Sequence, residues 1–236
     1  MGFLDGKSRP EVSKMEKEGN LTGLLKALRE GAPDTRWEVT QALGRLKDEK
    51  AIEPLLSALE DPDSDLRWNA VKALGKIGNP LATDGLINAL GDDLEHVQLH
   101  AAEALGYIGD EKAVEPLIKL LENNKIRNTV VIALGRIKSK IAVSYLIEAL
   151  KEDDYSYRSA VGEALGMIGD ERAIDPLIKA LDDEDISVRR HAAGALGKIG
   201  SQRAIPALER LLNDKRWYVR LQVEEALQDI EADKKS

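Results

Sequence analysis

The chain has 236 residues, no cysteine, few aromatic residues (4%) and a formal net charge of −8 at pH 7. The lack of cysteine excludes disulfides and thiolate metal sites and fits a reducing compartment. The negative charge argues against a general nucleic-acid or anionic-membrane binder. No apolar run approaches the length of a membrane span, and the first residues are too short and too acidic for a secretory signal. A cytoplasmic protein is therefore expected.

The first predicted element is a short helix over residues 10–18. Pro10 suits the first turn, Val12 and Met15 share one face, and Gly19 ends the helix. We expect residues 1–19 to form a loose tail and a capping helix, which covers apolar surface that has no preceding neighbour.

From residue 20 onward the sequence repeats. An Ala-Leu pair occurs at 42–43, 73–74, 104–105, 133–134, 164–165, 195–196 and 226–227, so the period is 31 residues with one spacing of 29. Each period holds two amphipathic patterns of helical spacing, and a fixed period of this size is typical of a solenoid. We therefore predict one repeat solenoid over residues 20–236, made of seven helix pairs. Their approximate bounds are 20–47, 48–78, 79–109, 110–138, 139–169, 170–200 and 201–233.

Glycine and proline recur at fixed places in the repeat. Glycine at 78, 109, 169 and 200 follows the second helix, where a left-handed residue closes a helix. A second set lies two residues after the marker alanine, inside the helical pattern: Gly44, Gly75, Gly106, Gly135, Gly166 and Gly197. Each costs about 1 kcal/mol relative to alanine, so we infer that a neighbouring helix backbone approaches closely there. Pro54, Pro116 and Pro176 predict first helices that begin late or in a 3₁₀ turn.

Arginine occupies one position, six residues before the marker alanine, in six of the seven repeats, and Gln98 replaces it in the third. The residues are Arg36, Arg67, Arg127, Arg158, Arg189 and Arg220. One hypothesis is a basic stripe for phosphate. The other, which we favour, is a ladder of structural pairs between successive repeats, because acidic residues crowd the preceding turns.

The repeated pattern resembles the HEAT-like repeats of the phycobilisome-lyase type over about Asn20 to Asp233. The resemblance implies an all-α fold, a right-handed superhelix of about seven antiparallel helix pairs. It also implies that the second helices line a concave face, which in such proteins usually binds another macromolecule.

Helix geometry separates the variable face of the second helices from their core stripe. The positions one, four, five and eight before the marker alanine point away from the stripe. From these positions we select the candidate partner-binding residues Trp37, Trp68, Leu99, Ile132, His96, His100, Arg190 and Leu221. Trp37, Trp68 and Leu99 stand in register and would form an apolar ridge, and tryptophan is enriched at binding hot spots. The alternative is that both tryptophans fold down and cover the core.

His96 and His100 are four residues apart, a spacing that can hold a metal, with Glu95, Glu103 and Asp65 as the only further ligand candidates nearby. We expect surface histidines and no cofactor. Deoxyhypusine hydroxylases share the repeat type and carry His-Glu pairs five and four before the marker, but no such pair occurs here. Six acidic residues against three basic ones on the variable face disfavour nucleic acid.

The sequence thus predicts a non-catalytic scaffold, a monomer or weak oligomer, that binds a protein partner on its concave face. The alternative is an accessory or catalytic subunit of a lyase or metal-dependent enzyme built on such repeats.

Overall fold

The computed structural model describes residues 9–233, which form fifteen helices and no strand. The expected loose tail over the first residues lies outside this range. The chain divides into two compact units, residues 1–116 and 117–236, and each is described by itself. No helix within residues 9–233 combines the length and apolar character needed to cross a membrane.

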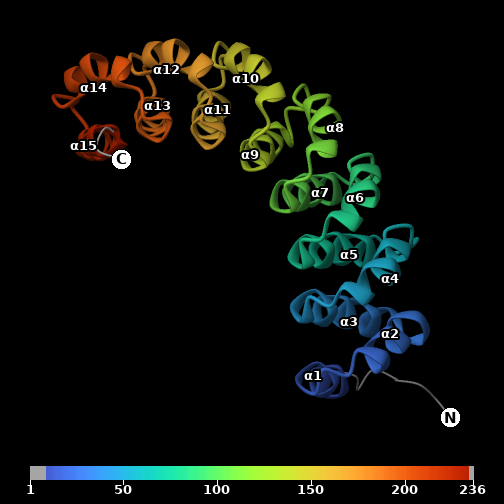
Figure 1. Cartoon of the computed structure of the whole chain (residues 1–236). Helices are drawn as coiled ribbons and strands as arrows, with labels where there is room; N and C mark the ends of the chain where they lie inside the picture. Colours follow the sequence, from blue (N-terminus) through green and yellow to red (C-terminus); the bar gives the residue numbers. More distant parts are fainter. Residues whose placement is uncertain (1–8, 234–236) are drawn as a thin grey trace. The chain divides into compact units, whose positions relative to one another are not determined.

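The first unit consists of two layers of helices that alternate along the chain. In Figure 1, α3, α5 and α7 lie in one layer and α2, α4 and α6 in the other. The bounds are α1 Arg9–Lys17, α2 Leu21–Glu30, α3 Pro33–Leu46, α4 Ile52–Ala58, α5 Ser64–Ile77, α6 Thr83–Ala89 and α7 Glu95–Ile108. The short helix α8, Val114–Ile118, spans the division between the units.

The second unit repeats this arrangement. Its second helices are α9 Arg127–Ile137, α11 Tyr155–Ile168, α13 Ile186–Ile199 and α15 Trp217–Asp233. Its first helices are α10 Val143–Ala149, α12 Ile174–Ala180 and α14 Ile205–Leu211. The α-solenoid architecture is confirmed. The marker pair is buried in the first six repeats, as Ala164 and Leu165 show with no exposed area, and in the seventh Ala226 is buried and Leu227 half-buried. One core continuous through all seven repeats, and the handedness of the superhelix, stay predictions.

The expected first helix is present and packs on the first repeat. Val12 is buried, and Arg45 of α3 donates two hydrogen bonds, of 2.6 and 2.8 Å, to the carboxylate of Glu16. Gly19 adopts a left-handed φ of 63° at the end of the helix. These contacts fix α1 against α3.

A 3₁₀ turn precedes each first helix from the second repeat onward, at residues 49–51, 80–82, 111–113, 140–142, 171–173 and 202–204. Proline is not its cause, because the turn also forms in the repeat with Gly85 and in the repeat with Tyr145 at the proline position. In five of these repeats an Asp, Asn or Ser side chain caps the turn by accepting from the backbone N–H two residues on, as Asp48 does from Lys50 at 2.9 Å. The turn at 202–204 forms without such a cap, so the cap accompanies five of the six turns and is not required for the turn either.

The glycines inside the second helices lie where successive helices touch. A β-carbon at Gly44, Gly135, Gly166 or Gly197 would lie 2.7–2.8 Å from the Cα of the alanine 29 residues further on, and one at Gly75 would lie 2.8 Å from the Cβ of Ala104. These distances are shorter than any van der Waals contact between carbon atoms. The inferred close approach of the backbones is confirmed at these five positions.

The arginine ladder is structural, as predicted. Five of the six guanidinium groups reach an aspartate in the turn of the next repeat: Arg36 to Asp61 at 2.6 Å, Arg67 to Asp92 at 2.7 Å, Arg127 to Asp154 at 3.0 Å, and Arg158 to Asp183 and Arg189 to Asp214 at 2.8 Å. Arg220, in the last repeat, donates to the Asp214 carbonyl oxygen of its own preceding turn at 2.7 Å. Most of them also donate to carbonyl oxygens of their own preceding turn, as Arg158 does to Glu152 and Asp153. The hydrogen bond from Arg67 holds the pKa of the Asp92 carboxyl below its ordinary range. These arginines are therefore engaged in holding successive repeats together.

Candidate functional site

The predicted binding residues lie on the second helices, and the two units divide them. Trp37, Trp68 and Leu99 are half-buried on α3, α5 and α7 of the first unit. In the second unit, Ile132 and Arg190 are half-buried and Leu221 is 46% exposed. The first unit alone therefore carries three large apolar side chains at one repeat position on successive helices.

Trp68 is held by side chains of its own helix and of the next. Its ring meets those of His96 and His100 edge to face, with centroids 6.0 and 5.5 Å apart, and the Lys72 ammonium lies 4.3 Å from the ring centroid. A cation over an indole face is attracted by the negative charge of the ring quadrupole. The indole Nε1 is buried and has no hydrogen-bond partner. Trp68 thus combines the two alternatives: it packs on its neighbours and still presents part of its surface.

The two histidines contact the tryptophan and one another. His100 Nδ1 lies 2.7 Å from the carbonyl oxygen of His96. A carbonyl oxygen only accepts, so the ring proton of His100 is on Nδ1. Within residues 9–233 no three His, Asp or Glu side chains converge into a group that could hold a metal ion.

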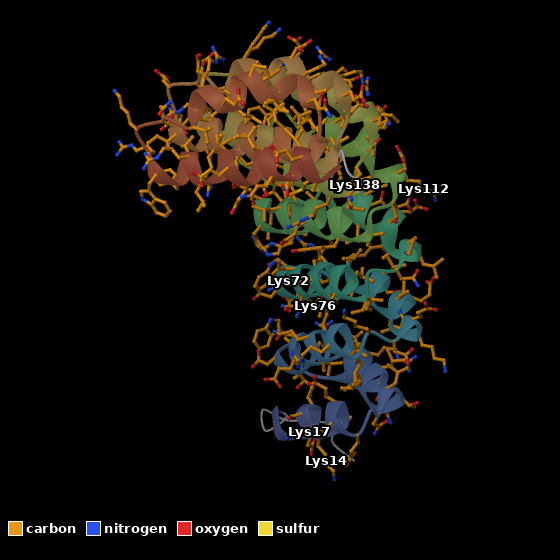
Figure 2. All side chains as sticks on the ribbon, turned by 60° about the vertical axis from the view of Figure 1, so that its left-hand side comes forward. Lys14, Lys17, Lys72, Lys76, Lys112 and Lys138 are labelled. Atoms are coloured by element: carbon orange, nitrogen blue, oxygen red, sulfur yellow. The ribbon has the colours of Figure 1, made fainter. Side chains whose placement is uncertain are left out.

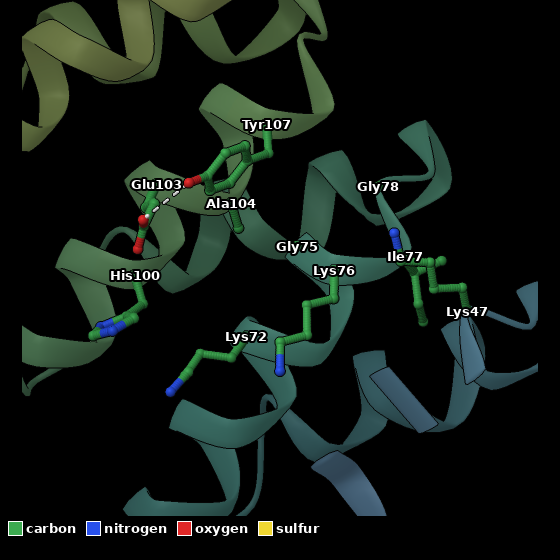
Figure 3. A pocket seen from close by; sticks show the side chains of 10 residues that line it. All are labelled: Lys47, Lys72, Gly75, Lys76, Ile77, Gly78, His100, Glu103, Ala104 and Tyr107. Atoms are coloured by element: carbon green, nitrogen blue, oxygen red, sulfur yellow. Dashed lines mark hydrogen bonds between the residues drawn. The ribbon is translucent and has the colours of Figure 1, made fainter. Parts of the chain in front are cut away.

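A pocket of about 720 Å³ opens beside this cluster, between the C-terminal halves of α5 and α7. The charged and aromatic side chains that line it are Lys47, Lys72, Lys76, His100, Glu103 and Tyr107. In Figure 3 Lys72 and Lys76 extend from α5, and His100 and Glu103 come from α7. The Tyr107 hydroxyl, on a side chain 59% exposed, makes a long contact of 3.5 Å with the Glu103 carboxylate. Three lysines and one glutamate are therefore among the residues that line this space.

Sequence reasoning missed Lys47, Lys76 and Tyr107 as site residues. Lys76 and Tyr107 follow Lys72 and Glu103 by four residues, so each lies on the same helix face as its partner. Continuing the variable face by one turn would have found them. Lys47 gave no periodic signal, because it follows α3 at the position where four other repeats have glycine.

A second pocket, of about 1100 Å³, lies in the second unit and is lined by side chains of both charges. Its charges pair with one another: Lys151 lies 2.6 Å from Glu148, and Arg127 lies 3.8 Å from Glu152. Arg127 also covers the ring of Tyr157 at 4.1 Å. This pocket therefore has no excess of one charge, whereas the pocket of the first unit is cationic.

One contact in the second unit resembles a catalytic pair: Ser159 Oγ lies 2.6 Å from His191 Nδ1. His191 Nε2 in turn lies 3.1 Å from the guanidinium of Arg190, which can only donate. Nε2 must therefore accept, and the ring proton on Nδ1 is donated to the serine oxygen. Burial lowers the pKa of His191, and the charge of Arg190 lowers it further. In this arrangement the histidine does not act as a base toward Ser159.

The fold and the site together define an α-helical repeat protein whose variable second-helix face carries the candidate binding residues. The sequence matches the profile of HEAT repeats over residues 21–96, 83–166 and 143–228. The chain belongs to the HEAT-repeat family.

Among solved structures, the chain is similar to the complex of CpcE and CpcF of phycocyanin lyase from Nostoc sp. PCC7120. Identity is 27% and the TM-score 0.59, over 89% of this chain and 92% of that one. It is also similar to the archaeal HEAT-like repeats protein from Thermococcus onnurineus NA1, at 19% identity and a TM-score of 0.60, over 89% and 97%. Importin beta matches with a TM-score of 0.65 and 18% identity, over 96% of this chain and 37% of that one. The last two likenesses concern the fold alone. No curated protein matches the chain in sequence.

Proposed function

We propose that this protein is a non-catalytic scaffold that binds a protein partner on the second-helix face of its first unit. One observation carries the proposal. Trp37, Trp68 and Leu99 occupy one repeat position on three successive helices, where the next three repeats have Asn128, Ser159 and Arg190. The repeats with polar residues at this position form the same helix pair, so the repeat fold does not depend on tryptophan there. Large aromatic side chains that are partly exposed and in register are typical of binding hot spots.

The likeness to the phycocyanin lyase complex supports the proposal, because that structure is an assembly of two different proteins. We extend the resemblance to the repeat type and assign these repeats to the phycobilisome-lyase class. An accessory subunit of a lyase is the second candidate, and it has the same likeness in its favour. The tautomer of His191, with its proton on Nδ1, favours the non-catalytic function over an enzyme with Ser159 as nucleophile, because His191 donates to the serine oxygen and does not accept its proton.

A matched pair of leucines in the third repeat tests the proposed face. Leu99 lies on α7, and Leu81, 71% exposed, lies in the 3₁₀ turn before α6 in the other layer. Wild type, Leu99→Asp and Leu81→Asp are used as bait in lysate of the source cells, and retained proteins are quantified by mass spectrometry. Far-UV circular dichroism and thermal melting confirm that all three baits are folded.

We expect at least one protein that wild type and Leu81→Asp retain and Leu99→Asp loses. An aspartate at the centre of an apolar contact costs far more than one outside it, because the contact would bury its charge. A set of captured proteins that is the same for both variants would contradict the proposed face.

A further inference from the structure

We propose that the cationic pocket of the first unit binds an acidic peptide segment of the partner, with glutamate or aspartate carboxylates between Lys47, Lys72 and Lys76. The inference rests on the proposed function and names the chemistry of the partner. Its basis is a group of three lysines in a protein whose net charge is −8.

Within residues 9–233 the ammonium groups of these three lysines have no carboxylate partner. Among the described residues none of the three lysines forms an ion pair, whereas Lys112 in the same unit pairs with Asp84 at 3.6 Å. The one carboxylate on the pocket wall, that of Glu103, is in contact with the Tyr107 hydroxyl. Figure 2 places Lys72 and Lys76 together on one side of the first unit, with Lys112 on the opposite side. Within the described part of the chain, the three lysines of the pocket thus bring positive charge without an ion-pair partner to one side of the first unit.

Lys47 supports the assignment through its backbone. It has a left-handed φ of 54° at the end of α3, at the position where Gly78, Gly109, Gly169 and Gly200 close the corresponding helices. A side chain in this conformation is strained, at Lys47 as at Lys138, and such strain persists only where the surrounding structure fixes it. A lysine near the C-terminus of a helix is favoured by the helix dipole. The dipole does not explain the strained backbone, however, because a lysine one turn earlier would interact with the C-terminus equally well and would not need a positive φ.

The form of the pocket favours a peptide over a small anion. Its volume of about 720 Å³ accommodates several side chains. Lysines on flexible stems fit a run of carboxylates, since they act as separate point charges and lack the planar fork of arginine. The apolar row with Trp68 and Leu99 lies on the same two helices, so a bound segment can continue from the lysines onto it. The net charge of −8 makes the chain as a whole repel such a segment, so its binding depends on a local group of lysines.

The test uses fluorescein-labelled hexaglutamate as the probe and the intact chain at low ionic strength, with binding followed by fluorescence anisotropy. Lys76→Gln is compared with Lys112→Gln, which removes the same charge on the other side of the unit. Lys47→Gly is compared with Lys138→Gly, because Lys138 has the same left-handed conformation, with a φ of 60°, and does not line the pocket. Hexalysine serves as the peptide of opposite charge.

We expect Lys76→Gln and Lys47→Gly each to weaken hexaglutamate binding about fivefold, and the two controls to leave it within about twofold. Lys47→Gly should also raise the thermal midpoint, which separates lost binding from lost folding. Equal affinity of Lys76→Gln and Lys112→Gln, or no binding by wild type, would overturn the proposal. Displacement of the peptide by an equal concentration of inorganic pyrophosphate would also overturn it, in favour of a small-anion site.

The two experiments distinguish a failure of the proposed partner-binding face from a failure of the proposed acidic-peptide site. If the leucine pair behaves as expected and hexaglutamate does not bind, the face is correct and the acidic partner is wrong. If hexaglutamate binds as expected and the leucine variants capture the same proteins, the pocket is an anion site unrelated to the apolar row.

Discussion

The close contact between Gly166 and the next helix makes Gly166→Ala a sharp test of how the repeats pack. The added β-carbon would lie 2.7 Å from the Cα of Ala195, so α11 and α13 have to move apart. Gly162, in the same helix, provides the control. A β-carbon there would meet the Cβ of His191 at 3.5 Å, an ordinary contact.

The magnitudes follow from the two environments. Alanine is a better helix former than glycine by about 1 kcal/mol, so Gly162→Ala should stabilise the protein by about 0.5–1 kcal/mol. The same gain applies at Gly166 but is opposed by overpacking, which costs about 1–3 kcal/mol in a close-packed interior. The propensity gain cancels in the comparison. Gly166→Ala should therefore be less stable than Gly162→Ala by about 1–3 kcal/mol.

Urea unfolding followed by circular dichroism measures both variants, with tryptophan fluorescence as a second probe of whether the transition is two-state. Amide hydrogen exchange shows which helices are destabilised. The loss of protection should be greatest in α11 and α13, because each repeat packs only on its neighbours. Equal stability of the two variants would refute the inference that this glycine is required by the backbone contact.

Two further outcomes are expected. The hydrogen bond from Arg172 lowers the pKa of the Asp170 carboxyl from its ordinary value of 3.8 to about 2, so this pair contributes stability that is present above pH 3.8 and is lost as the pH falls towards about 2. The wild-type midpoint should therefore fall more steeply than that of Asp170→Asn in this window, and parallel curves in urea titrations would contradict the assignment. Lys138→Gly should raise the free energy of unfolding by about 1 kcal/mol through relief of its left-handed φ of 60°, and a thermal midpoint equal to or below that of wild type would be the contrary result.

Much of the fold could be predicted because the same residue types recur at the same positions in successive repeats. The first repeat, predicted over about residues 20–47, holds its helix pair at Leu21–Glu30 and Pro33–Leu46. The ladder was predictable because arginine and aspartate recur in register with the repeat. The internal glycines identified the helix contacts, because a residue unfavourable in a helix recurred without any local reason.

The site was predictable only in part, because it depends on contacts between neighbouring repeats. The position five before the marker meets the positions eight and four before the marker of the next repeat. Trp68 contacts His96 and His100 in this way, and Ser159 contacts His191. Position on one helix separates the core from the variable face, but it does not show which variable residues of two helices touch. Lys47 could not be predicted as a site residue for a different reason: its backbone has a positive φ, and a lysine in the sequence does not indicate that conformation.

The contact between each internal glycine and the following alanine bears on how such a chain can be lengthened. Each repeat carries an alanine that fits against the helix before it and a glycine that leaves room for the helix after it, as Ala195 and Gly197 do within α13. A duplicated segment of one period therefore brings both halves of the contact with it, and it fits between any two neighbours without a compensating substitution. Gene duplication, or an engineer inserting one 31-residue cassette, would thus extend the array without redesigning the surfaces where its repeats join.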